Sequence, residues 1–387
     1  MRHRRRAFLH AAALATGLLM GCPSTVRARD DERVSARAEL GVEYDNNVHR
    51  VEQLPADHLN VVGSPLARAV VGLSVSDRVA ASQDVAISVL GAAKAFTSPA
   101  ARSENVGIVE SSGAWNVNLS PRTRLGAGAT YYEAIQAGSP TERALTAERD
   151  MVVEARDFRS IVPSLRAVQA LTDATTLGLS AGYRLFVYKP LPDYDFHAPV
   201  ASLEHRFVHE TADGDADWAL VSALSVELRR FAGPRLLASA PDASGARHGD
   251  QFLTAQIDVT RTGRVLVGAG YALQWNRSNS FGESLLRHIG TIRFAASLPL
   301  GLYLAARTEL VYVSYPDRLP LVMNGATGQA NASIEEETRS EVRAELSRDI
   351  AAHLQLAARY SLYANALGQG GEYRRQTGTL SLIYATN

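Results

Sequence analysis

The chain has 387 residues, of which 46% are hydrophobic and 21% are charged. This composition is too polar for a helical membrane protein, yet it suits both a soluble protein and a transmembrane β-barrel, in which only every second residue of a strand faces lipid. The formal net charge is +0, so composition excludes the strongly basic surface by which nucleic-acid-binding domains attract phosphate. The pattern of residues along the chain must therefore decide the class.

The first 28 residues have the features of a signal peptide. Arg2 to Arg6 form a basic start, and Ala7 to Met20 form an apolar segment that is too short to cross a membrane as a permanent helix. Val26-Arg27-Ala28 then offers the small residues that signal peptidase recognises. We therefore predict a signal peptide over residues 1–28 and one exported domain over residues 29–387.

Two other targeting signals overlap this segment. Leu19-Met20-Gly21-Cys22 resembles a lipoprotein cleavage site, at which Cys22 would be lipidated instead of removed. Arg5-Arg6-Ala7-Phe8-Leu9 resembles a twin-arginine signal, which does not suit a barrel because barrels reach their assembly machinery unfolded. Cys22 is the only cysteine of the chain, so an oxidising compartment requires no disulfide here.

Alternation of apolar and polar residues recurs along the rest of the chain. Between Val34 and Tyr44, apolar even-numbered residues alternate with polar or small odd-numbered ones, and the same period of two returns over residues 177–187, 265–275, 302–312 and 354–362. A strand that crosses a membrane at a tilt of about 45° needs about 9–11 residues, and these runs reach that length. No later stretch is apolar for long enough to form a transmembrane helix.

Short and long links alternate between the predicted strands. This is typical of outer-membrane barrels, which have tight periplasmic turns and longer extracellular loops. With an even number of strands, the chain enters and leaves the barrel on the periplasmic side. The predicted short links are 77–78, 120–122, 172–175, 211–216, 262–264, 299–301 and 350–352, and the long links are 46–64, 97–104, 138–157, 189–195, 233–249, 277–285, 315–337 and 366–372.

The predicted fold is all-β: a single transmembrane, antiparallel, up-and-down β-barrel in the bacterial outer membrane. An additional hairpin in 150–157 or 315–337 would make 18 strands, which is the alternative to 16. The 16 predicted strands are 33–45, 65–76, 79–96, 104–119, 122–136, 158–171, 176–188, 196–210, 217–231, 250–261, 264–276, 286–298, 302–314, 338–349, 353–365 and 373–385.

If the apolar residues of each strand face lipid, the alternate residues face the lumen, and these carry most of the charges. Placing them on the lipid face would cost roughly 2–4 kcal/mol for an arginine at mid-depth. Clustered arginines bind carboxylate or phosphate, so they predict a path for an anionic or sugar-like solute; the alternative is a set of Arg–Glu ladders that only brace the wall. The lumen-lining candidates are Arg37, Arg124, Arg184, Arg229, Arg293, Arg307, Glu309, Arg343, Arg359 and Arg375.

Small and aromatic residues complete the pattern. Glycines recur at inward positions, for example Gly178, Gly268 and Gly270, which predicts a thin wall with room for a solute or an inserted loop. Aromatic residues near the predicted strand ends suggest the interfacial girdles of a barrel, although ordinary strand propensity gives the same enrichment. At the extracellular ends the girdle would include Tyr44, Tyr131, Tyr132, Tyr188, Trp275, Tyr312, Tyr315 and Tyr363, and at the other ends Trp115, Trp218 and Tyr384.

Signatures of catalysis are weak. The chain contains no G-x-S-x-G, H-E-x-x-H or P-loop motif, so we predict no catalytic, cofactor-binding or metal site and no enzyme activity. The segment Asp213 to Asp217 begins like a calcium loop but lacks the glycine and distant glutamate of an EF-hand. Asp195 and His197, near a predicted rim, leave a hydrolase barrel as an alternative.

Gly41-Val42-Glu43-Tyr44-Asp45-Asn46-Asn47-Val48 resembles the first strand of outer-membrane β-barrel porins, many of which carry a G-x-x-Y-D-x-N segment after the signal peptide. Gly182-Tyr183-Arg184-Leu185-Phe186, Tyr194-Asp195-Phe196 and Asn276-Arg277-Ser278-Asn279-Ser280 look like the same group. The final aromatic residue read by the assembly machinery is displaced, because the chain ends Tyr384-Ala385-Thr386-Asn387.

The resemblance implies a conduit without catalysis. Relatives of this kind accompany surface-polysaccharide secretion, so it implies export of a polysaccharide with a periplasmic export protein as partner. The alternatives are a diffusion porin for small anionic or sugar solutes and a plugged structural or enzymatic barrel. The other expected partners are outer-membrane lipid, lipopolysaccharide and the barrel-assembly machinery, with no nucleic acid.

Overall fold

The computed structural model describes residues 34–48, 61–136, 157–189, 192–210, 217–237, 240–281, 283–316, 339–365 and 374–386. The predicted signal peptide and Cys22 lie outside these residues, so both remain predictions. In the part of the chain described, no helix has the length and apolar character needed to cross a membrane.

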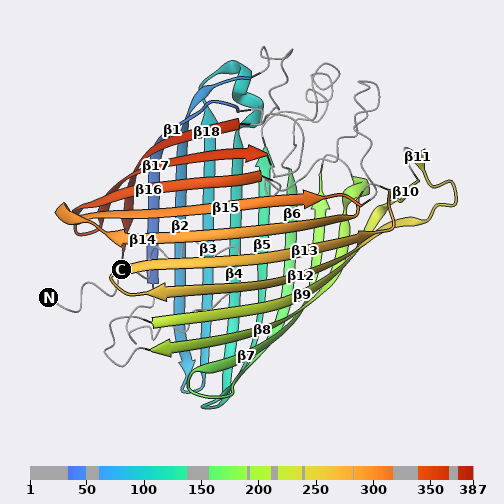
Figure 1. The fold of residues 1–387 in the computed structure, drawn as a ribbon, viewed down its shortest axis with the longest axis horizontal. Helices are drawn as coiled ribbons and strands as arrows, with labels where there is room; N and C mark the ends of the chain where they lie inside the picture. The colour runs from blue at the N-terminus through green and yellow to red at the C-terminus, as the bar shows by residue number, and fades with distance from the viewer. Residues whose placement is uncertain are drawn as a thin grey trace.

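Sixteen antiparallel strands close into one barrel (Figure 1). Each strand pairs with the next along the chain, and the last pairs with the first, as in an up-and-down barrel. The barrel strands are β1 (Val34–Asp45), β2 (Ser64–Ala80), β3 (Gln83–Phe96), β4 (Val106–Ser120), β5 (Thr123–Gln136), β6 (Phe158–Ala170), β7 (Thr175–Tyr188), β8 (Phe196–Glu210), β9 (Asp217–Pro234), β12 (Arg247–Thr262), β13 (Val265–Ser278), β14 (Leu285–Ser297), β15 (Leu302–Ser314), β16 (Arg339–Ala351), β17 (Leu354–Asn365) and β18 (Arg374–Ala385).

The prediction of 16 barrel strands is confirmed, and the barrel is closed without a further hairpin. A separate two-stranded sheet, β10 (Leu236–Leu237) and β11 (Ala240–Pro241), projects beyond the wall (Figure 1). The segments proposed to hold the additional hairpin fall almost wholly outside the described residues. The predicted turn at 77–78 is wrong, because β2 passes through a register shift between Asp77 and Ala80 and pairs as far as Ala80 with Gln83.

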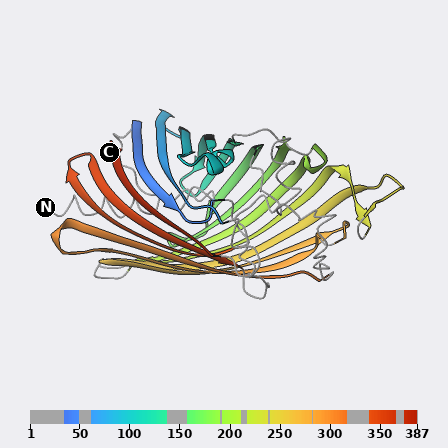
Figure 2. The same cartoon turned by 90° about the horizontal axis from the view of Figure 1, so that it is seen from above.

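Opposite walls of the barrel cross in projection because the strands are tilted (Figure 1). Seen at 90°, the molecule is flattened, with β1–β8 forming much of one wall and β12–β17 much of the other (Figure 2). Long links lie at one end of the strands, which we call the mouth, and short turns lie at the other. The start of β1 and the end of β18 meet at the short-turn end, where Arg37 is opposite Ala385.

The outer surface of the barrel is apolar. Large apolar side chains such as Leu40 (66% exposed), Leu165 (65% exposed) and Ile292 (58% exposed) project outward, and in their strands β1, β6 and β14 exposed residues alternate with buried or half-buried ones. In water, so large an apolar surface would drive aggregation. Around a closed sheet, in which every strand has two hydrogen-bonded neighbours, it is the surface that a membrane requires.

One buried ion pair and two side-chain hydrogen bonds hold the seam between β1 and β18. Arg375 on β18 donates from Nη2 and Nε to Asp45 Oδ2 on β1, at 2.6 and 2.9 Å, and both side chains are almost fully buried. Further along the seam, Thr379 donates to Glu43 and Ser381 donates to Glu39, each at 3.1 Å. The two ends of the chain are thus joined by side chains as well as by the backbone ladder.

Arg375→Ala should destabilise the barrel by about 3–5 kcal/mol, because it leaves Asp45 as an uncompensated buried charge. Urea titration of the folded barrel in detergent measures this as a lower midpoint. Arg374→Ala, at the adjacent exposed position, is the matched control and should change the midpoint little. The double variant Asp45→Leu/Arg375→Met should recover most of the loss; equal loss in Arg374→Ala and Arg375→Ala would contradict a specific seam contact.

Candidate functional site

The ten predicted lumen-lining residues alternate with the exposed apolar residues of their strands and all take part in ion pairs. This arrangement matches the Arg–Glu ladders that the sequence left as the structural alternative. The pairs are Arg37–Glu39, Arg124–Asp84, Arg184–Glu227, Arg229–Glu227, Arg293–Asp258, Arg307–Glu309, Arg343–Glu341, Arg359–Glu345 and Arg375–Asp45.

Three of the arginines form a row on neighbouring strands. Arg293 on β14 lies opposite Arg307 on β15, and Arg307 lies opposite Arg343 on β16. Like charges directly opposite each other in a sheet are destabilising, so folding stability alone does not select this arrangement. The neighbouring acids Asp258, Glu309 and Glu341 partly neutralise the row. We call Arg293, Arg307 and Arg343 the arginine row.

Several pairs reach over an intervening strand. Two strand spacings amount to roughly 9–10 Å, which an arginine and an acid span together only if the residue between them is small. Arg293 on β14 reaches Asp258 on β12 across β13. Arg166 on β6 reaches Glu204 on β8 across β7, with Nη2 3.2 Å from Oε1.

The inward glycines supply this space. A Cβ atom on Gly268 would lie 3.2 Å from Arg293 Nε, and one on Gly270 would lie 2.7 Å from Asp258 Oδ2. A Cβ atom on Gly178 would lie 3.5 Å from Arg166 Nη2. The sequence predicted that these glycines leave room for a solute or a loop; charged side chains from the neighbouring strands occupy that room instead.

Several acids of the inner face were not predicted from the sequence. Asp45 and Glu204 pair with arginines, and Asp250 contacts His248 at 2.8 Å. Asp45 follows Arg37, a predicted lumen-lining residue of the same strand, by eight positions, and Asp250 precedes Asp258, the partner of Arg293, by eight. Extending the alternation to the ends of the strands would have found Asp45 and Asp250.

Donor capacity remains on the arginines despite this pairing. The Nε–H groups of Arg37, Arg68, Arg124, Arg184, Arg293 and Arg307 are buried and have no hydrogen-bond acceptor among the described residues. A guanidinium has five N–H donors in a planar fork, and a single carboxylate does not use them all. These Nε–H groups are themselves buried, so a carboxylate or phosphate in the lumen would instead meet the terminal N–H groups of part-exposed guanidiniums such as those of Arg307 and Arg343.

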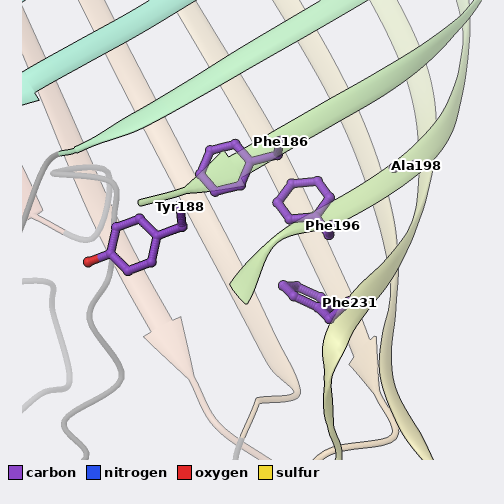
Figure 3. Packing of buried hydrophobic residues seen from close by; sticks show 5 residues of the cluster. All are labelled: Phe186, Tyr188, Phe196, Ala198 and Phe231. Atoms are coloured by element: carbon purple, nitrogen blue, oxygen red, sulfur yellow. The ribbon is translucent and has the colours of Figure 1, made fainter. Parts of the chain in front are cut away.

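Toward the mouth the inner face changes from charged to aromatic. Phe186, Phe196 and Phe231 come from β7, β8 and β9 and lie side by side (Figure 3). Their ring centroids are 4.7 Å apart for Phe186–Phe196 and 5.1 Å apart for Phe196–Phe231. Stacking continues to Phe158 and Tyr132 on one side and to His248 on the other. This ring row stiffens six adjacent strands near their mouth ends.

Two smaller apolar clusters lie at other points of the mouth. Leu66 and Phe96 pack with Val48 and with Ala101 of the short helix η2 (Pro99–Glu104). Val311 and Val313 of β15 form the other cluster. Together with the ring row, these clusters form closely packed apolar patches on the inner face at the mouth, next to buried charged pairs such as Asp45–Arg375.

The predicted aromatic girdle is right only in part. Tyr44, Trp275 and Tyr312 project outward at the mouth, and Trp115, Trp218 and Tyr384 do so toward the other end. Tyr188, however, is 2% exposed and belongs to the inner cluster, and Tyr132 stacks on Phe158. Tyr132 is an even number of positions from the inward Arg124 of its strand, and Tyr188 from the inward Arg184. The alternation of the strand therefore decides which face a tyrosine is on, and its distance from the strand end does not.

The residues proposed for a hydrolase do not act together. Asp195 accepts the backbone N–H of Tyr188 at 2.6 Å, whereas His197 contacts the hydroxyl of Tyr183 at 2.5 Å. Asp250 and Ser278 both contact Nε2 of His248; a relay would place them on different ring nitrogens. Across the described ranges, no group of three or more His, Cys, Asp or Glu is placed to hold a metal ion.

The β10–β11 hairpin is tied at its base. Arg235 Nε donates to Asp242 Oδ2 at 2.6 Å, and the Ser244 backbone N–H donates to Asp242 Oδ1 at 2.8 Å. Hydrogen bonds from the backbone and side chain of Ser244, with that from Arg235, lower the pKa of Asp242 to about 2. Gly245 completes the turn with φ +71°, a conformation that favours glycine.

A closed sheet of antiparallel strands, an apolar outside and an inside that carries the charges define a transmembrane β-barrel of the outer membrane. No protein-family model matches the chain, and no curated protein matches its sequence. Its fold is similar to that of bacterial outer-membrane porins of known structure.

Three of these porins match this chain over nearly the whole of both lengths. They are Pseudomonas aeruginosa OpdK with vanillate (12% identity, 91% of this chain and 98% of that chain, TM-score 0.45), Pseudomonas aeruginosa OccK2 (OpdF) in complex with glucuronate (14% identity, 92% and 96%, TM-score 0.46), and Acinetobacter baumannii OccAB3 (9% identity, 92% and 99%, TM-score 0.47). Similarity at this level shows the fold alone, so the solute of this barrel has to be inferred from the barrel's own residues.

Gly268→Val should displace Arg293 from Asp258, because the new methyl groups occupy the space through which the guanidinium reaches. The loss of one partly exposed charged hydrogen bond should lower the free energy of unfolding by about 1–2 kcal/mol, measured by urea titration. Gly290→Val, where a Cβ atom meets nothing within 4 Å, is the control and should be neutral or stabilising. Equal destabilisation by both valines would contradict the bridging role.

The hairpin should depend on pH through Asp242. Its folded pKa of about 2 is below the usual 3.8, so the ionised carboxylate stabilises the hairpin above about pH 3.8, and this contribution is lost as pH falls toward 2. Amide hydrogen exchange of residues 240–246, corrected for the intrinsic rate, should quicken over that window. Asp242→Asn should exchange fast throughout, whereas Asp193→Asn should behave as wild type; a wild-type rate without pH dependence would refute the assignment.

Proposed function

We propose that this barrel is a passive, porin-like conduit for small anionic or sugar-acid solutes across the outer membrane. The arginine row is the observation that carries the proposal. Adjacent like charges weaken a sheet, and the side chains of Arg293, Arg307 and Arg343 remain 28%, 33% and 44% exposed beside their acids, so the row is better explained by an interaction with a mobile anion than by bracing of the wall.

Transport through such a site requires binding that is favourable enough for entry and weak enough for release. The internal carboxylates meet the second requirement, because Asp258, Glu309 and Glu341 compete with the solute for the same guanidinium groups. Arg184 and Arg229, which share Glu227, would provide a second station on β7 and β9. A solute carboxylate would then pass between these two groups of arginines. It would be bound weakly at both, because each arginine already has an internal acid as partner.

Export of a surface polysaccharide, which the resemblance implied, stays a prediction. The described residues offer no feature that favours a long polymer over a small solute. The ring row does not provide open aromatic platforms for successive sugars, because Phe186, Phe196 and Phe231 are each less than 10% exposed and stack on one another.

Single-channel recording in a planar bilayer under a salt gradient tests the proposal. The wild-type barrel should conduct with a preference for chloride over potassium, and glucuronate should reduce the chloride current by competing for the same groups. Arg307→Gln, at the centre of the arginine row, should lower the anion preference roughly twofold, which corresponds to about 0.4 kcal/mol.

Arg261→Gln is the matched control, because this guanidinium lies over the Trp218 ring, 5.6 Å from its centroid, on an outward position. It should leave the reversal potential unchanged. Cation preference in the wild type, or an equal shift in both variants, would contradict the proposal. If the folded wild-type barrel does not conduct, the proposal is wrong and the alternative of a plugged barrel is favoured.

A further inference from the structure

The outer surface at the mouth carries most of its basic side chains on one side. Arg159 on β6, Lys189 directly after β7, Arg230 on β9 and Arg277 on β13 are exposed. Each continues an outward apolar series: Arg230 follows Leu228 and Val226, and Arg277 follows Trp275 and Tyr271. These four residues, which we call the basic arc, therefore stand above the lipid-facing surface where headgroups begin.

The other side of the mouth lacks this character. Among the described strand residues of β15–β18 and β1–β4, the outward positions near the mouth carry one basic side chain, Arg374, and the short helix η2 between β3 and β4 adds the exposed Arg102. A need only to anchor the barrel at the interface would distribute basic residues evenly around it. Of the acids near the arc, Glu133 pairs with Lys189 at 2.8 Å, and Asp193 lies in the short helix η3 (Pro192–Tyr194) between β7 and β8, so the four basic residues keep a positive excess. Arg230 and Arg277 have no side-chain partner among the described residues.

Two tyrosine–histidine pairs accompany the arc. The Tyr183 hydroxyl lies 2.5 Å from His197 Nδ1, and the Tyr271 hydroxyl lies 2.7 Å from His288 Nδ1. In both histidines Nδ1 contacts the tyrosine hydroxyl, and Nε2 has no partner among the described residues. His197 is also the cross-strand neighbour of Arg230. Arginine, histidine and tyrosine are thus brought together beside Gly249, the other neighbour of Arg230.

We propose that the basic arc is a binding site for the phosphate groups of lipid A, the phosphorylated glycolipid anchor of lipopolysaccharide in the outer leaflet, with Arg230 and Arg277 as its main contacts. The guanidinium fork matches phosphate oxygens. At the edge of a hydrocarbon region, weaker screening strengthens the attraction. The outward side chains below, including Leu185, Leu224 and Leu228, would contact the acyl chains. This site lies on the outside of the wall and is independent of what passes through the lumen.

Native mass spectrometry of the refolded full chain in detergent micelles, titrated with bis-phosphorylated lipid A, tests the proposal. The wild type should retain the lipid as a discrete adduct. The same lipid without its phosphates should bind much more weakly. Arg230→Gln/Arg277→Gln should weaken binding by roughly tenfold for each arginine, since each loses a charged hydrogen-bonding contact, whereas Arg230→Lys/Arg277→Lys should retain most of it.

Arg374→Gln is the control on the opposite side and should bind as wild type. All variants should show the heat-modifiable electrophoretic mobility of a folded barrel, because the substituted side chains are exposed. The proposal is overturned if the phosphate-free lipid binds equally well, which would leave acyl contacts alone. It is also overturned if Arg374→Gln loses as much affinity as Arg230→Gln/Arg277→Gln. That result would mean that lipid A is attracted by the overall charge of the protein and not by a specific site.

Discussion

A strand in a bilayer must have both of its edges hydrogen-bonded, because lipid offers no partner to a free N–H or C=O group. In this chain the requirement is met last at the seam, where β18 returns to β1 over nine paired positions from Arg37–Ala385 to Asp45–Thr377. The seam joins residues more than 330 positions apart, so it carries the largest chain-closure entropy of any strand pairing in the barrel. Placing the buried Asp45–Arg375 pair and the Glu39 and Glu43 hydrogen bonds at this junction offsets that loss where it is greatest.

Closure also determines the chemistry of the interior. Once the apolar residues face lipid, most charges of the sixteen strands are gathered on one concave face, and each of these needs a partner within reach. Small residues on intervening strands allow arginines to reach acids two strands away, so the wall is cross-braced perpendicular to its strands. The arginine row is an exception, because like charges lie opposite each other there. We propose that this row binds the transported anion. The outer surface shows a similar departure, since the basic arc is the uneven part of an otherwise apolar belt.

The strands and the two faces could be predicted from the sequence because period-two alternation reports burial directly. Residue partners could not be, because Arg293 meets Asp258 only after closure has set the register of β12, β13 and β14. The turn after β2 was misplaced because Asp77-Arg78 looks like a polar link. In the structure β2 continues through these two residues by means of a register shift against β3. The ring row was missed for a different reason: Phe186, Phe196 and Phe231 have inward parity, but their contacts join neighbouring strands. Tyr132 and Tyr188 beside them were assigned to the lipid interface.

The central claim is that the polar face of the sheet encloses water while the apolar face contacts lipid. Cysteine accessibility at two adjacent positions of β8 tests it most directly. Ser202 is on the inner face, where its hydroxyl lies 2.6 Å from that of Ser180, and Leu203 is 45% exposed on the outer face. In a Cys22→Ser background and with the barrel in vesicles, Ser202→Cys should react quickly with a charged, membrane-impermeant thiol reagent, and Leu203→Cys should not. Slow reaction at Ser202→Cys, or the reverse order, would contradict a water-accessible lumen.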